Sequence, residues 1–119
     1  MDSWTWLGFY TAVTSAAEVK RKAKAGAVPV DLRSAEDFSA GHLPGAIHVP
    51  ADEILADPGA FEARVRKSRP EARAVTLYLA GGEEPALYRV AQALSGQGRL
   101  AVFVYPAGYS GGSSDHSTE

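Results

Sequence analysis

Short apolar runs of strand length alternate along this chain with segments that carry helix-start signals. The clearest runs are rich in β-branched and aromatic residues and cover Ala27 to Leu32, Ala74 to Leu79 and Leu100 to Tyr105. Continuous apolar strands of this kind are typical of parallel sheets, in which helices cover both faces. The alternation therefore predicts an α/β domain with a mostly parallel sheet.

Two weaker runs complete a predicted sheet of about five strands, at Phe9 to Thr14 and Ala46 to Val49. Pro29 counts mildly against the strand Ala27 to Leu32, because proline cannot donate a hydrogen bond to a neighbouring strand. We find no internal repeat and no internal linker, so the strands and helices are expected to belong to one domain.

Residues that cap a first turn mark the helix starts. Ser15 begins a segment with the form of a capping box, and Ser34 is a suitable N-cap for a short helix that ends before Gly41. Asp57 is followed by proline, which predicts a third helix start. Pro85 opens the last helix, whose apolar residues recur at helical spacing: Leu87, Val90, Ala91 and Leu94.

Length and charge exclude several classes of protein. A chain of 119 residues with 45% hydrophobic residues forms one domain with a substantial core. The net charge of −2 gives no basic field for nucleic acid, and no apolar run reaches the roughly 18 residues that span a bilayer. The cations of the first helix are interpreted as a solvated face that suits its C-terminus: Lys20, Arg21, Lys22 and Lys24.

The chain divides into three parts. Residues 1–8 form an aromatic N-terminal extension, residues 9–110 form the domain, and residues 111–119 are rich in Gly and Ser and are expected to be a disordered tail. Since no export signal is visible at the start, we expect a cytoplasmic protein that binds neither nucleic acid nor membrane.

One segment carries the most specific pattern of the chain. It begins Asp-Leu-Arg-Ser-Ala-Glu-Asp-Phe at Asp31 and continues Gly-His-Leu-Pro-Gly-Ala-Ile-His-Val-Pro from Gly41 to Pro50. At this spacing the pattern resembles the signature of rhodanese-like sulfurtransferases. The resemblance covers roughly Phe9 to Tyr109. It implies a rhodanese fold, with three layers α/β/α around a central, mostly parallel sheet.

Three charged residues of this motif, Asp31, Arg33 and Glu36, lie just past the end of a strand. Open α/β sheets bind ligands at that edge. We nevertheless interpret the three residues as an ion-pair and capping cluster that fixes the turn.

The histidines and glycines of the motif are also expected to be structural. His42 is expected to hydrogen-bond its own turn, and Gly41 and Gly45 to allow backbone conformations that other residues resist. His42 and His48 do not indicate a metal site, because the third histidine, His116, lies in the tail. No metal and no cofactor is expected.

In this family the strand that corresponds to Ala74 to Leu79 ends in a nucleophilic cysteine. That cysteine opens a loop whose backbone N–H groups bind an anion and keep the thiol ionised. The chain contains no cysteine, and Leu79 stands at that position. Glu84 stands where the family often has an arginine. Aligned without gaps, the loop consists of Leu79, Ala80, Gly81, Gly82, Glu83, Glu84 and Pro85.

Each departure in the loop acts against anion chemistry. Leucine has no nucleophile, so sulfur cannot pass covalently through Leu79. Glu83 and Glu84 repel an anion or occupy the N–H groups themselves, and Pro85 lacks one N–H at the start of the helix. An acid–base or metal role for the two glutamates has less support, and Thr76 has no evident base to activate it.

We therefore expect a catalytically inactive rhodanese-like domain that acts in binding or regulation through the former active-site mouth, with a protein partner as the favoured occupant and a small ligand as the alternative. Tyr109 is expected to line that mouth, and Tyr105 is a further candidate for the contact surface. Trp4 and Trp6 either join this surface or, as we prefer, pack the N-terminus against the domain. The alternative function is a sulfurtransferase-related protein that needs a partner's cysteine to carry sulfur. A phosphatase-like site has weaker support, since it needs the same cysteine and arginine.

Overall fold

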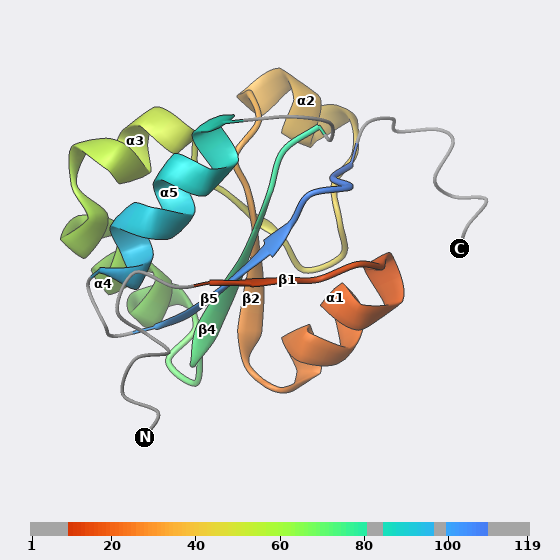
Figure 1. Ribbon diagram of the computed structural model, residues 1–119, viewed down its shortest axis with the longest axis horizontal. Helices are drawn as coiled ribbons and strands as arrows, with labels where there is room; N and C mark the ends of the chain where they lie inside the picture. The colour runs from red at the N-terminus through yellow and green to blue at the C-terminus, as the bar shows by residue number, and fades with distance from the viewer. Residues whose placement is uncertain (1–9, 81–84, 97–99, 110–119) are drawn as a thin grey trace.

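The computed structural model describes residues 10–80, 85–96 and 100–109. Five parallel strands form one sheet in the order β1-β5-β4-β2-β3, with helices on both faces (Figure 1). The strands are β1 (Thr11–Ala12), β2 (Ala27–Asp31), β3 (Ile47–His48), β4 (Ala74–Tyr78) and β5 (Ala101–Tyr105). The helices are α1 (Ala16–Lys24), α2 (Ala35–Ala40), α3 (Ala51–Ala56), α4 (Pro58–Ser68) and α5 (Pro85–Ser95). The predicted α/β class and parallel sheet are confirmed.

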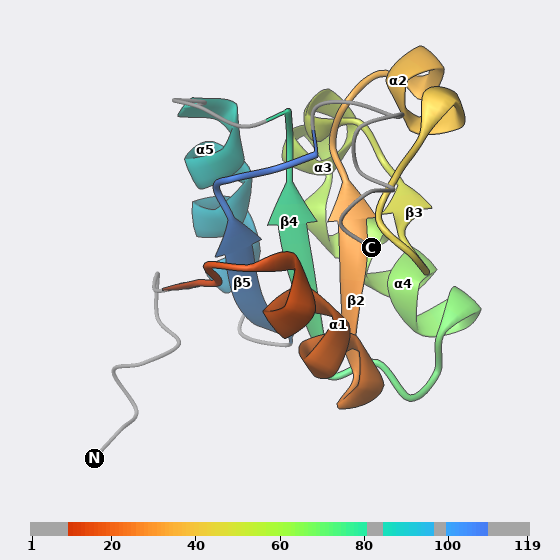
Figure 2. The ribbon, with the colours of Figure 1, turned by 90° about the vertical axis from the view of Figure 1, so that its right-hand side faces the viewer.

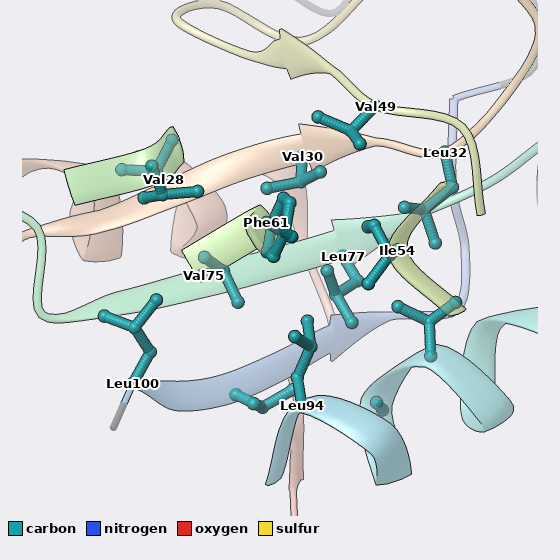
Figure 3. Close-up of a cluster of buried hydrophobic side chains, with 14 of the residues drawn as sticks. Val28, Val30, Leu32, Val49, Ile54, Phe61, Val75, Leu77, Leu94 and Leu100 are labelled. Atoms are coloured by element: carbon teal, nitrogen blue, oxygen red, sulfur yellow. The ribbon is translucent and has the colours of Figure 1, made fainter. Parts of the chain in front are cut away.

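The core consists of two hydrophobic clusters, one on each face of the sheet. The larger cluster lies between the strands and the helices α3, α4 and α5, and its members Val30, Ile54 and Leu77 are fully buried (Figure 3). The smaller cluster lies on the face covered by α1 and includes Val13 and Val19 (Figure 2). Side chains alternate between the faces of a strand, so the apolar runs of the sequence supply both clusters.

Side-chain caps set three of the helix starts, as predicted. Ser15, Ser34 and Asp57 each accept a hydrogen bond from the backbone N–H three residues later, over 3.1, 3.2 and 3.1 Å. The helix α3 was not predicted. It begins after Pro50, whose side chain makes no capping hydrogen bond, so the sequence carries no cap signal at this start.

Pro29 sits in β2 without the loss of a ladder hydrogen bond. The carbonyl of Asp31 accepts from the N–H of Val49 at 3.1 Å, on the side of β2 that faces β3. Backbone groups alternate sides along a strand, so the nitrogen of Pro29 faces the same side. Since β3 pairs only with Val30 and Asp31, that nitrogen lies beyond the paired part of β3.

The edge strands are shorter than predicted. The strands β1 and β3 have 2 residues each, against the longer runs expected from the sequence. The strand β5 is also less covered than expected, because Ala101 is exposed and Phe103 is half-buried beside the short strand β1. In the described ranges no helix is long and apolar enough to cross a membrane.

Candidate functional site

The C-terminal edge of the sheet brings together some of the predicted site residues, namely Asp31, Arg33, Leu79 and Tyr109. The ends of β2, β4 and β5 are in register, since Asp31 pairs with Tyr78 and Tyr78 with Tyr105. The chain segments that leave these strands therefore start side by side. The backbone N–H of Tyr109 donates to the carbonyl of Leu79 at 2.9 Å. This bond fixes the segment after β5 against the residue that follows β4.

Asp31 and Arg33 form a buried ion pair at this edge. Arg33 Nη2 lies 2.8 Å from Asp31 Oδ2, Arg33 Nε lies 3.0 Å from Oδ1, and the two side chains are 7% and 0% exposed. Arg33 also donates to the backbone carbonyls of Tyr109 (2.9 Å) and Gly41 (2.6 Å). The hydrogen bond with Asp31 is the largest factor that raises the pKa of Arg33. The guanidinium is thus a permanent cation with acceptors from within the protein.

Tyr78, the residue before Leu79, completes this buried network. Its hydroxyl donates to Asp31 Oδ2 at 3.0 Å and accepts from the N–H of Leu43 at 3.1 Å. Burial is the largest factor that raises the pKa of Tyr78 above the usual 10.0, so the phenol resists ionisation even in alkaline solution. The sequence reasoning missed this residue. The available signal was a tyrosine at the end of a buried strand, because a buried hydroxyl needs a partner.

Other residues of the motif lie outside this network. Glu36 is exposed and takes no part in the pair of Asp31 and Arg33. Gly45 has φ 77°, in the left-handed region that favours glycine, as expected. Gly41 has φ 165° and ψ 148°, an extended conformation open to any residue, so the expectation of special backbone freedom is wrong there.

Both histidines of the motif pack against Phe38. The ring of His42 stacks on it at a centroid distance of 3.9 Å, and the ring of His48 lies 5.2 Å away. Each imidazole donates to a carbonyl, His42 Nδ1 to Phe38 at 2.9 Å and His48 Nε2 to Arg33 at 2.7 Å. In the described part of the chain, no group of three or more potential ligands could hold a metal ion.

At the position of the expected cysteine, the structure places a half-buried aliphatic side chain. Leu79 packs against the larger core cluster, and the next residue, Ala80, is exposed. Pro85 is the first residue of α5 and is also exposed. The rest of the loop lies outside the described residues: Gly81, Gly82, Glu83 and Glu84.

Of the aromatic residues proposed as a contact surface, Tyr109 lies at the C-terminal edge of the sheet, beside Arg33 and Leu79. It is partly exposed, and its ring centre lies 5.0 Å from the guanidinium carbon of Arg33. Tyr105 is only 7% exposed and belongs to the smaller core cluster, so its proposed place on an exposed surface is wrong. Trp4 and Trp6 lie outside the described residues.

Thr76 gives a testable prediction about the core beneath this site. Its side chain is 0% exposed, and its hydroxyl has no hydrogen-bond partner among the described residues. A buried hydroxyl without a partner is unfavourable by about 1–3 kcal/mol. We therefore expect Thr76→Val, which keeps the shape, to raise the free energy of unfolding by about 1 kcal/mol in urea denaturation. The control Thr11→Val, on an exposed edge, should change the free energy of unfolding by less than about 0.5 kcal/mol. A lower free energy of unfolding for Thr76→Val would show that the hydroxyl has a buried partner, such as a water molecule.

The rhodanese-like domain family matches this chain over residues 15–115, and the chain belongs to that family. The match spans the buried Asp31–Arg33 pair, the Leu79 position and Tyr109. None of the curated proteins matches the chain at a significant level.

Solved structures share the fold at low sequence identity. The human single-domain sulfurtransferase TSTD1 is 24% identical with a TM-score of 0.60, over 82% of this chain and 90% of that one. Saccharomyces cerevisiae Ygr203w, a homologue of single-domain rhodanese and of the Cdc25 phosphatase catalytic domain, is 17% identical with a TM-score of 0.67, over 100% and 89%. Reduced Bacillus anthracis CoADR-RHD is 21% identical with a TM-score of 0.62, over 87% of this chain and 16% of that longer chain.

Proposed function

We propose that this chain is a rhodanese-like domain without sulfurtransferase activity that binds a protein partner at the former active-site mouth. The observation that carries the proposal is the missing nucleophile. The sequence contains no cysteine, and Leu79, at the position that opens the loop, packs half-buried against the core. An aliphatic side chain there can neither attack sulfur nor hold it as a persulfide.

The electrostatics of the mouth support the same proposal. A sulfur oxyanion needs cations or N–H groups that are free to face it. Arg33 stands at this edge, but its N–H groups are directed at Asp31, Gly41 and Tyr109. The guanidinium therefore acts as a brace between three chain segments.

The mouth keeps a rigid frame that suits binding. Its walls are tied by the bond from Tyr109 to Leu79 and by the bond from Arg33 to Tyr109, both 2.9 Å long. Ala80 is exposed and Tyr109 partly exposed on this frame. Tyrosines are enriched at protein interfaces, and contact residues held by a rigid scaffold lose little conformational entropy on binding.

Thiosulfate:cyanide transfer by the purified protein tests the loss of activity. We expect no turnover above a blank without protein. If only the loop changes removed the chemistry, the introduced thiolate of Leu79→Cys with Glu84→Arg should attack the outer sulfur of thiosulfate and form a persulfide as the S–S bond breaks and sulfite leaves. The product is detected as the mass of one added sulfur. Leu79→Ser with Glu84→Arg is the matched control and should not. Turnover by the unmodified protein would contradict the proposal.

Site-specific photo-crosslinking in the source cell tests the binding role. A crosslinking residue in place of Ala80 should give a defined adduct that Tyr109→Ala reduces. The same residue in place of Ala63, an exposed alanine on α4, is the control and should not give that adduct. Equal adducts from both positions would refute binding at the mouth. A partner captured with a persulfide on its own cysteine would instead favour the sulfur-carrier alternative.

A further inference from the structure

The N-terminal edge of the sheet, opposite the mouth, holds a shallow hollow that the proposed function does not use. Its volume is about 150 Å³, which is close to that of a cavity that accepts a benzene-sized group. It lies where the end of α1, the start of β2 and the connection from α4 to β4 meet, at the foot of the strands in Figure 2. Buried apolar residues and more exposed charged residues line it, among them Ala27, Pro29 and Ala72 with Lys24, Arg69 and Glu71.

Cations outnumber acids around this hollow. Lys24 and Arg69 line it directly. Arg73 lies next to Gly26, another lining residue, and its backbone N–H donates to the carbonyl of Gly26 at 2.9 Å. Glu71 is the acid in the lining. Within the described ranges none of the three cations joins a salt bridge, and the guanidinium of Arg69 donates only to a backbone carbonyl, at 3.2 Å.

Helix macrodipoles explain only part of this charge. Lys24 lies in the last turn of α1, where the negative end of the helix favours a cation. Arg73 lies beyond α4, in the connection that enters β4. The opposite edge carries acids in the first turns of α2 and α3: Glu36, Asp37, Asp52 and Glu53. Among the described residues the N-terminal edge is thus locally positive, although the chain has a net charge of −2.

We propose that this positive edge docks an acidic polypeptide segment of a partner protein. An apolar side chain of the segment occupies the hollow, and its carboxylates face Lys24, Arg69 and Arg73. Charge complementarity selects this occupant. The apolar lining suits an apolar side chain better than a sugar–phosphate backbone or a compact dianion such as phosphate, neither of which has an apolar group to place there.

The test is an NMR titration of the whole chain with a synthetic peptide in which glutamate alternates with leucine. We expect saturable shifts at the backbone amides of Gly26 and Ala72, with an affinity that falls as salt is added, because exposed charges are screened. Lys24→Glu with Arg69→Glu should weaken binding by at least about tenfold, which is about 1.4 kcal/mol. This test does not depend on binding at the mouth, so the docking proposal can fail while the proposed function holds, and the reverse.

A matched variant controls for net charge. Arg64→Glu with Arg89→Glu makes the same charge change at exposed positions away from the hollow and should leave the affinity unchanged. Both double variants are first compared with the unmodified protein for amide dispersion, to show that they fold. The proposal is overturned if the shifts are not saturable or if a peptide with lysine in place of glutamate binds equally well. It is also overturned if inorganic phosphate alone reproduces the shifts, or if Lys24→Glu with Arg69→Glu binds as before.

Discussion

Asp31→Ala is expected to lower the free energy of unfolding by about 3–5 kcal/mol, a large share of the stability of a domain of this size. The substitution leaves the guanidinium of Arg33, whose side chain is only 7% exposed, without its carboxylate. It also removes the acceptor of the Tyr78 hydroxyl. Urea denaturation followed by circular dichroism measures the loss.

Two further variants keep this prediction testable if Asp31→Ala does not fold. Asp31→Asn retains the size and one acceptor oxygen, so it should fold with a smaller loss, about 2–3 kcal/mol. Glu36→Ala removes an exposed carboxylate of the same motif and should change the stability by less than about 0.5 kcal/mol. Equal effects of Asp31→Ala and Glu36→Ala would show that the buried pair does not stabilise the fold.

Tyr78→Phe is expected to lower the free energy of unfolding by about 1–3 kcal/mol. The variant keeps the ring but leaves the buried N–H of Leu43 without its acceptor and removes one donor to Asp31. Tyr88→Phe, at a half-buried position on α5, is the control and should change the stability by less than about 0.5 kcal/mol.

The pH dependence of the free energy of unfolding gives a second test of the buried Tyr78 hydroxyl. An unfolded Tyr78 ionises near its usual pKa of 10.0, whereas burial raises the pKa of the folded residue well above that value. Above pH 10 the folded state therefore binds more protons than the unfolded state, so stability falls as the pH rises. Below the unfolded pKa the contribution is complete. Between about pH 9 and 11 the unmodified protein should lose stability more steeply than Tyr78→Phe, and equal slopes would contradict this account.

The parts of the fold that could be predicted from the sequence are those with local signals. The capping side chains of Ser15, Ser34 and Asp57 bond to backbone N–H groups within one turn. Each helix start can therefore be recognised from a few consecutive residues of the sequence. The helix α3 has no such cap, and its 6 residues are too few for a periodic pattern to mark it.

The parts of the site that escaped prediction depend on contacts between distant residues. Tyr78 bonds to Leu43 and Asp31, 35 and 47 positions away, and Arg33 bonds to Tyr109, 76 positions away. Propensity and spacing carry no information about such pairs. The burial of Tyr105 was missed for the same reason, because the smaller cluster that covers it assembles from separate elements.

The short edge strands affect how readily one copy of the domain can add a strand to the sheet of another. A long exposed edge strand is a template on which another chain can add its own strand, the first step of sheet polymerisation. Here both outer strands, β1 and β3, have 2 residues, and Pro29 offers no N–H just below β3. An incoming strand would find too few consecutive hydrogen-bonding groups to hold its register. The short outer strands thus leave few edge groups from which the sheet could grow, which lowers the tendency to edge-to-edge association.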